Sequence, residues 1–289
     1  MQDGLILCRF VHFGAVLLLF GIGLFRHLLF TRALPAFEAS PASRRLDRAL
    51  GWMAGVALLS ALSWLMLTAA NMTDSWHDAT DPHTLALVLT HTFFGHVWIL
   101  HLLLNVLLVF CGFALRNRPR LSLLLAGLLL LTLAPVGHGA MYDGFTGRLL
   151  IFNQMLHLIG VATWLGGLVM LATLLLGSAT VDLRAVLGRF GGIGYGLVAL
   201  IVATGMINVR ALSGALWPAP ALWGFGLVLG VKVAMVLCML VLAGINRQLA
   251  RNQVLNLGWL RISVLLECLF GAAALGAVSL LGTLPPMLA

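Results

Sequence analysis

The sequence GHGAMYDG at positions 137–144, followed by LHLIGVATWLGG at positions 156–167, decides how the chain is organised. The first segment reads as the end of an apolar helix and a short polar turn, and the second lies within the next apolar helix. His157 and Trp164 are seven residues apart, which is two helical turns, so they share one face. The glycine pair that ends the second segment would let a neighbouring helix approach closely. A histidine in a membrane-length apolar segment usually marks a functional site, because burying an ionisable group there is costly.

The composition predicts an all-α, polytopic membrane protein. Hydrophobic residues make up 61% of the chain and charged residues 9%. Runs of about 20 apolar residues recur, and each is long enough to cross a hydrocarbon core of about 30 Å. A β-barrel would instead show short segments of strict alternation. The net charge of +8 does not indicate a nucleic-acid partner, because the cations lie in short loops between apolar runs, where membrane topology explains them. The expected surroundings are membrane lipids.

We predict a single transmembrane domain over residues 1–289, built from eight helices. A short surface helix near residues 85–92 is expected before the third span. The eight predicted spans are about 5–30, 49–70, 93–115, 121–141, 149–176, 190–212, 222–246 and 259–284.

The cations orient this predicted bundle. Eight spans place both termini on the same side, and most of the 17 lysine and arginine residues then fall on the opposite side. Because cytoplasmic loops carry the excess of positive charge, both termini are predicted to face the periplasm.

Histidine and methionine side chains gather in the half of the bundle that this orientation places outside. Imidazole suits copper, zinc, iron and nickel, whereas thioether ligands favour Cu(I), so the mixed set points to copper more than to zinc. The alternative for any single histidine is a hydrogen bond between helices. The candidate metal ligands are His12, His96, His101, His138, His157, Met141 and Met155.

Ionisable and thiol groups also lie deeper, in the last two spans. Lys232 and Glu267 approach the middle of the membrane from opposite faces, where each charge would need a partner. They are predicted to form either a structural ion pair or part of a proton or ion pathway. Cys238 and Cys268 lie on the same two helices and could contribute a soft inner Cu(I) site, with core packing as the alternative. None of the four cysteines has the spacing of a disulfide framework.

Over nearly its whole length the sequence resembles the CopD family of bacterial inner-membrane copper-resistance proteins. The residues that carry the resemblance are Gly137-His138, His157 with Trp164-x-Gly-Gly, Thr92-Phe-Phe-Gly95-x-x-Trp98, Lys232 followed by Asn246-Arg247, and Glu267 with Pro285-Pro286. The resemblance implies eight spans in the inner membrane, copper movement across it, and delivery of the metal by a periplasmic CopC-type carrier. His101 stands where many relatives would be expected to have arginine, so a ligand role for it is not carried over.

Three functions are compatible with these residues. The first is a copper transporter that imports from the periplasm, with outer histidines and methionines capturing the ion. The second is a b-type haem membrane protein or oxidase, because histidines on different helices can ligate haem axially. The third is a copper-binding platform that does not transport. The sequence contains no ATPase motif, so transport by this chain would not be driven by ATP, and we do not expect an enzyme.

Overall fold

The computed structural model describes residues 1–114, 118–137, 142–177, 181–215, 217–218, 222–251 and 256–284. Within these ranges the secondary structure is helical and contains no strand. The helices are α1 (Gln2–Leu24), its π-helical continuation η1 (Phe25–Leu29), α2 (Pro35–Glu38), α3 (Pro41–Thr73), the short 3₁₀ turn η2 (His77–Ala79), α4 (Pro82–His91), α5 (Phe93–Ala114), α6 (Pro119–Leu131), α7 (Gly144–Leu176), α8 (Leu183–Ser213), α9 (Gly224–Arg251) and α10 (Leu257–Leu281).

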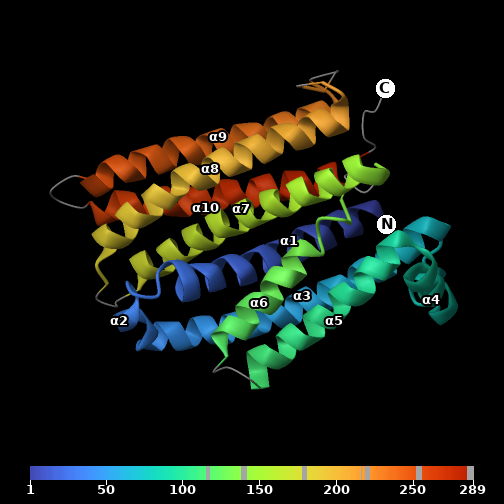
Figure 1. Cartoon of the computed structure of the whole chain (residues 1–289), viewed down its shortest axis with the longest axis horizontal. Coiled ribbons are helices and arrows are strands. Elements are labelled where there is room, and N and C mark those ends of the chain that lie inside the picture. The colour runs from blue at the N-terminus through green and yellow to red at the C-terminus, as the bar shows by residue number, and fades with distance from the viewer. Residues whose placement is uncertain are drawn as a thin grey trace.

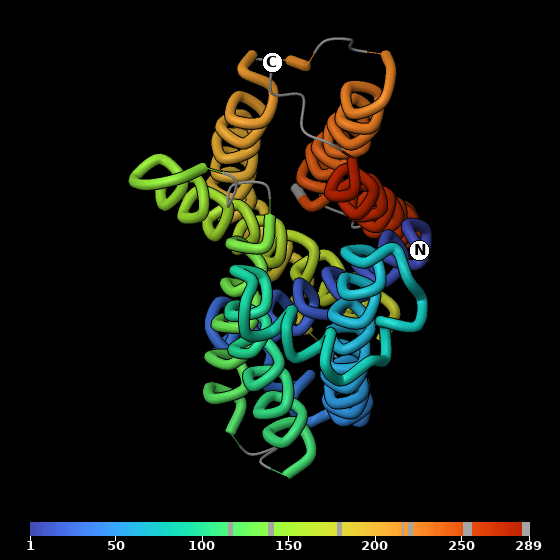
Figure 2. Tube along the Cα trace, turned by 90° about the vertical axis from the view of Figure 1, so that its right-hand side faces the viewer, coloured from blue at the N-terminus to red at the C-terminus, as the bar shows by residue number. Residues whose placement is uncertain are grey.

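Helices α1 and α7 pack against each other at the centre of the bundle (Figure 1). Helices α3, α5 and α6 cover one side of this central pair, and α8, α9 and α10 cover the other side (Figure 2). The start of α1 and the end of α10 lie at the same end of the bundle, together with α4 (Figure 1). The N-terminal and C-terminal halves of the sequence therefore meet along α1 and α7.

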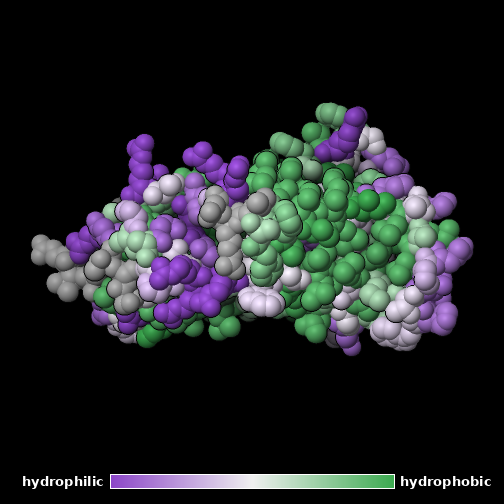
Figure 3. Space-filling model, turned by 90° about the horizontal axis from the view of Figure 1, so that it is seen from below, coloured by the Kyte–Doolittle hydropathy of each residue, from purple (hydrophilic) through white to green (hydrophobic). Residues whose placement is uncertain are grey.

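The surface of the bundle is that of a multi-pass membrane protein. Of the helices in the described ranges, seven are long and apolar enough to span a membrane: α1 with η1, α3, α5, α7, α8, α9 and α10. An apolar expanse covers the centre-right of the surface seen in Figure 3, and hydrophilic side chains lie on both sides of it. Large hydrophobic side chains on this outer surface, such as Leu103 and Phe110 of α5, are more than half exposed, as expected for contact with lipid.

The predicted span at 121–141 differs most from the structure. Helix α6 ends at Leu131, so its 13 residues fall short of the roughly 20 that a full span needs. Pro135 explains the early end, because proline has no backbone N–H and its ring clashes with the carbonyl four residues earlier. The chain continues as turns as far as Gly137. His138 and Met141 lie outside the described residues.

The polar residues between α3 and α5 form helix caps. Asp81 precedes Pro82 and accepts a hydrogen bond of 2.8 Å from the backbone N–H of Thr84, which starts α4. The Thr92 hydroxyl oxygen accepts a hydrogen bond of 2.9 Å from the backbone N–H of Gly95 at the start of α5. A side chain at Gly95 would meet the backbone of α4, since a Cβ there would lie 2.0 Å from the Val88 carbonyl oxygen. The predicted surface helix near 85–92 is thus confirmed as α4.

The glycine pair of α7 permits close contacts with two neighbouring helices. A Cβ on Gly166 would lie 2.2 Å from the carbonyl carbon of Gly21 in α1, and a Cβ on Gly21 would lie 1.9 Å from the carbonyl oxygen of Ala162. A Cβ on Gly167 would lie 2.3 Å from the ring of Phe190 in α8. The close approach predicted from these two glycines is confirmed, and it fixes the central α1–α7 pair backbone against backbone.

A buried arginine holds the other end of α1 in place. The Arg26 side chain is 2% exposed and makes ion pairs of 2.7 Å with Glu38 of α2 and Asp47 of α3. Burial alone would raise the pKa of the Glu38 carboxyl, but the hydrogen bonds and charge of Arg26 hold it below its ordinary value. This network ties η1 and α2 to the start of α3.

Candidate functional site

Two histidines meet in the interior between α1 and α5. The Nε2 atom of His12 lies 2.8 Å from the Nε2 atom of His101, and both side chains are completely buried. The two residues are 89 positions apart in the chain, so only the packing of α1 and α5 against their shared neighbours α3 and α6 brings them together. We call His12 and His101 the histidine pair.

Aromatic rings enclose the histidine pair. The Trp98 ring stacks on the imidazole of His101, with centroids 4.5 Å apart and an angle of 16° between the planes. The edge of Trp64 contacts His12 at a centroid distance of 5.7 Å. Trp98 is itself fixed by a hydrogen bond of 3.0 Å from its Nε1 to the carbonyl oxygen of Ala61 in α3. The electron-rich face of Trp98, stacked on His101, favours positive charge on that imidazole.

The outer nitrogens of the pair contact oxygen atoms that orient both rings. Nδ1 of His12 lies 3.1 Å from the carbonyl oxygen of Ala57, which only accepts, so this nitrogen donates. Nδ1 of His101 lies 2.7 Å from Oγ1 of Thr132, and that hydroxyl lies 2.7 Å from the carbonyl oxygen of Leu129. When the hydroxyl donates to Leu129, both imidazoles donate through Nδ1 and turn the lone pairs of Nε2 toward each other. When it donates to His101, Nε2–H of His101 donates to Nε2 of His12.

In the arrangement in which both Nδ1 atoms donate, the two Nε2 lone pairs 2.8 Å apart repel unless a cation lies between them. A single proton satisfies the pair at this distance. A metal ion would need bonds of about 2 Å to each nitrogen, so the rings would have to separate to about 4 Å. The Nδ1–H donors to carbonyl and hydroxyl oxygens are the outer-shell contacts that orient metal-ligating histidines.

The other histidine of α5 and the methionine of α7 do not join this pair. His96 is exposed, and its Nε2 hydrogen-bonds the carbonyl oxygen of Thr90 at 2.9 Å. Met155 packs half-buried against the hydrophobic core of the N-terminal half. Within the described ranges, no group of three or more histidine, cysteine, aspartate or glutamate side chains is placed to hold a metal ion. The histidine pair is thus a contact of two imidazoles without a third such side chain among the described residues.

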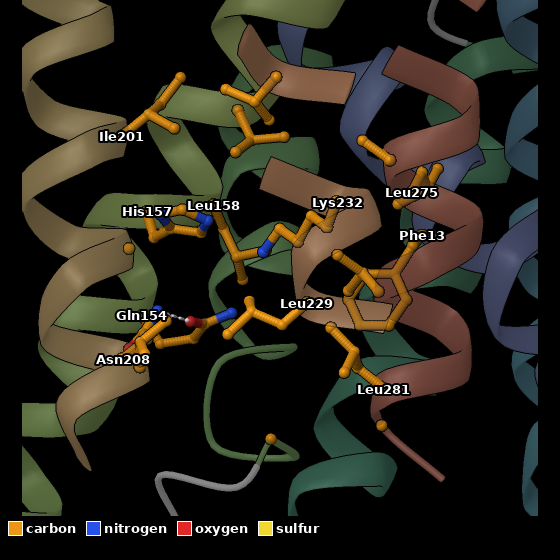
Figure 4. Close-up of a pocket in the computed structure, with 18 of the residues that line it drawn as sticks. Phe13, Gln154, His157, Leu158, Ile201, Asn208, Leu229, Lys232, Leu275 and Leu281 are labelled. Atoms are coloured by element: carbon orange, nitrogen blue, oxygen red, sulfur yellow. Dashed lines mark hydrogen bonds between the residues drawn. The ribbon is translucent and has the colours of Figure 1, made fainter. Parts of the chain in front are cut away.

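His157 lies on the opposite side of α1, beside a cavity of about 250 Å³ among α1, α7, α8, α9 and α10 (Figure 4). Its Nδ1 lies 2.8 Å from Oγ1 of Thr204, which donates in turn to the carbonyl oxygen of Leu200 at 2.6 Å. His157 therefore repeats the pattern of the pair: Nδ1–H is held by a threonine, and the lone pair of Nε2 is left for another partner.

The predicted ion pair between Lys232 and Glu267 is wrong. Glu267 is 1% exposed and accepts a hydrogen bond from the side-chain amide of Asn246 in α9. Lys232 lies 14 residues before Asn246 on that helix, which is about 21 Å along its axis, and it lines the cavity beside His157. Because α9 and α10 run antiparallel, Lys232 faces the far end of α10 rather than its middle (Figure 1).

The inner thiols also differ in their surroundings. Cys238 is exposed on the surface of the bundle, whereas Cys268 is half-buried and packs against the C-terminal core. Glu267 is next to Cys268 in sequence. One carboxyl oxygen of Glu267 and the side-chain oxygen of Asn246 have no hydrogen-bond partner among the described residues. The polar group at this depth is therefore Glu267 with Asn246, rather than a pair of thiols.

Sequence reasoning missed several residues that build the site. Ser60 accepts from Nδ1 of His12 at 2.9 Å, and its backbone carbonyl accepts from the thiol of Cys8 at 3.1 Å. Cys8 and His12 are four residues apart on α1, a spacing that could have linked them. Thr132 gave no such signal, since it lies in a leucine-rich stretch at the end of α6.

The fold and this site define a class: a polytopic helical membrane protein with a buried pair of imidazoles. Comparison with known proteins makes the class specific. Residues 1–148 match the model for "Copper resistance protein D-like, N-terminal domain", and residues 184–281 match the model for "Copper resistance protein D". The chain belongs to the copper resistance protein D family.

Two curated relatives cover almost the whole chain. Inner membrane protein YebZ of Escherichia coli (strain K12) is 30% identical over 287 residues, which is 96% of this chain and 97% of that protein. Copper resistance protein D of Pseudomonas syringae pv. tomato is 30% identical over 308 residues, covering 99% of this chain and 98% of that protein. No solved structure matches the chain.

Proposed function

We propose that this protein imports copper as Cu(I) across the bacterial inner membrane, and that the histidine pair is the binding site through which the ion passes. The observation that carries the proposal is the contact of 2.8 Å between the buried Nε2 atoms of His12 and His101, inside the membrane bundle of a copper resistance family member. Imidazole is a good copper ligand, and Cu(I) accepts two ligands in line. Zinc almost always takes four.

The proton that satisfies the empty pair must leave when the metal enters. The lone pairs accept either a proton or Cu(I), since both need the same two nitrogen atoms. Each ion is monovalent, so the exchange leaves the charge buried in the pair unchanged, which avoids a large desolvation cost. We therefore propose that the protein exchanges one proton for each Cu(I).

The haem alternative is not favoured at the pair. Axial ligation places a whole porphyrin plane between two nitrogen atoms, so a haem needs free space beside the pair as well as separation of the rings. Trp64 and Trp98 occupy the adjacent space, and both are almost fully buried. A copper-binding platform without transport uses the same pair and is distinguished by the uptake experiment below.

Import also needs an entrance and an exit. We propose that a periplasmic CopC-type carrier delivers copper at the end of the bundle that holds the start of α1. His157, with its free Nε2, would receive the ion on the cavity side. Toward the cytoplasm, the buried acceptor oxygens of Glu267 and Asn246 that lack partners would continue the path. In this proposal Lys232, Cys238 and Cys268 lie beside the path and do not bind the ion.

The proposed orientation makes a topological prediction. We expect α6 and the turns after it to complete an eighth crossing, so that both termini face the periplasm. This is supported by the common end of α1 and α10 and by the cation excess in the loops at the opposite end (Figure 1). A C-terminal alkaline phosphatase fusion should be active and a C-terminal GFP fusion dark. An active GFP fusion would contradict the orientation.

Transport is tested in proteoliposomes that contain a Cu(I)-responsive dye and, in a parallel preparation, a pH-responsive dye. We expect saturable Cu(I) entry that is absent from empty liposomes, together with movement of protons in the opposite direction. Copper that binds to the protein without entering the liposomes would support a platform and contradict transport. Copper entry without proton movement would contradict the exchange.

A further inference from the structure

The cavity beside His157 contains positive charge without a matching acid. Its lining includes Lys232 of α9 and Arg9 of α1, whereas no aspartate or glutamate lines it among the described residues. The amine of Lys232 points into the cavity toward His157 (Figure 4). It has no hydrogen-bond acceptor and no ion-pair partner in the part of the chain that the structure describes.

Arg9 is only partly satisfied. One of its terminal nitrogens donates a hydrogen bond of 3.3 Å to the carbonyl oxygen of Gly282, which follows α10. Its guanidinium lies 4.9 Å from the centre of the Trp64 ring. Its Nε is buried without a partner. Arg9 and Lys232 therefore reach the same cavity, and a ligand with negative charge would compensate both side chains.

Two further polar side chains, Gln154 and His157, lie near the amine of Lys232 (Figure 4). The side-chain oxygen of Gln154 accepts 2.8 Å from the amide of Asn208, so the NH₂ group of Gln154 is left for the cavity (Figure 4). Nε2 of His157 supplies an acceptor at the same level. A head group with oxygen acceptors can bind Lys232 and Gln154 together, and charge-assisted hydrogen bonds of this kind are the strong ones.

The remainder of the cavity is apolar. Leu158, Ile201, Leu229 and Leu275 line it around the polar cluster (Figure 4). Its volume of about 250 Å³ is close to the lower end of small-molecule sites, about 300 Å³. It therefore suits a small anionic head and the first part of an apolar chain rather than a large polar molecule.

We propose that this cavity binds an anionic amphiphile, with its negatively charged head on Lys232 and Gln154 and its chain along the apolar wall. The source is either a fatty carboxylate or a lipid phosphate, which share this chemistry. The proposal does not rest on copper transport, because it is argued from the lining of the cavity and its test contains no copper.

Tryptophan quenching by brominated amphiphiles tests the site, because Trp164 lines the cavity. Purified protein in a neutral detergent is titrated with 11-bromoundecanoate, 11-bromoundecyl phosphate and uncharged 11-bromoundecanol. The same titration is done with Trp164→Phe, and its quenching is subtracted from that of the unmodified protein. The difference is the signal of Trp164, free of the tryptophans on the lipid-facing surface. We expect saturable quenching of Trp164 by at least one charged probe, and the tighter charged probe identifies the source.

The lysine variants decide the role of the charge. Lys232→Met should weaken the affinity for the charged probe by about tenfold or more, which corresponds to about 1.4 kcal/mol. The affinity for the alcohol should not change. Lys232→Arg, which keeps the charge, should retain binding and guards against a misfolded variant. The matched control is Arg148→Met, an exposed cation of α7 outside the cavity. The proposal is overturned if the alcohol binds as tightly as the charged probes, if Lys232→Met does not weaken them, or if Trp164 is not quenched.

Discussion

In proteoliposomes, His101→Ala is expected to reduce Cu(I) uptake to the level of empty liposomes. The substitution removes one of the two nitrogen atoms at the site, and a single imidazole cannot hold a two-coordinate ion. His12→Ala should have the same effect, and the double variant should be no worse than either single variant, because the two residues act as one unit. Initial uptake rates are divided by the amount of folded protein, measured by size-exclusion chromatography.

The matched control is His96→Ala. His96 lies on the same helix, five residues before His101, but it is exposed and bonds only the carbonyl oxygen of Thr90. Uptake should stay within about twofold of the unmodified protein. Thr132→Val, which removes the hydroxyl that orients His101, should lower copper affinity by about 10- to 100-fold, as typical for an outer-shell contact. Full uptake by folded His101→Ala would remove the pair from the pathway.

The second large effect is expected at Gly166, where even alanine should destabilise the fold strongly. The added methyl group would lie 2.2 Å from the backbone of Gly21, and neither helix has a side chain there that could rotate away. Helices α1 and α7 must then separate, which costs about 1–3 kcal/mol or more for overpacking. We expect a Tm several degrees lower in detergent and less protein in the membrane.

Two further glycines calibrate this result. Gly196 of α8 has open space where a Cβ would lie, so Gly196→Ala should leave Tm unchanged or raise it slightly through helix propensity. Gly167→Ala should be intermediate, because the atom it meets belongs to the Phe190 side chain, which can shift. A Gly166→Ala protein as stable as Gly196→Ala would show that the α1–α7 contact is looser than described.

Much of the fold follows from apolar periodicity and length, because a membrane imposes both. The helix before α5 and the close approach at Gly166 and Gly167 were predictable for a different reason, because each depends on only a few neighbouring residues. The span at 121–141 failed because the apolar composition continues past Pro135 while the backbone cannot. Hydrophobicity therefore indicated membrane residence correctly but not the end of α6.

The site was predictable as a set of residue types and not as a set of contacts. The histidines of α1 and α5 stood out because an imidazole is rare in an apolar span, yet nothing in the sequence pairs residues 12 and 101. The pairing of Lys232 with Glu267 failed because depth was estimated from helix ends that the structure places elsewhere: α9 extends to Arg251, and Asn246 faces Glu267. Contacts between helices depend on register, which periodicity does not specify.

X-ray absorption spectroscopy at the copper edge tests the histidine pair most directly. The protein is loaded with one equivalent of Cu(I) under reducing conditions, beside His101→Ala and His96→Ala. The account predicts two nitrogen ligands at about 2 Å with imidazole scattering, unchanged in His96→Ala and lost in His101→Ala. A spectrum with sulfur ligands at about 2.3 Å, or one that His101→Ala leaves unchanged, would place the copper elsewhere in the protein and contradict the account.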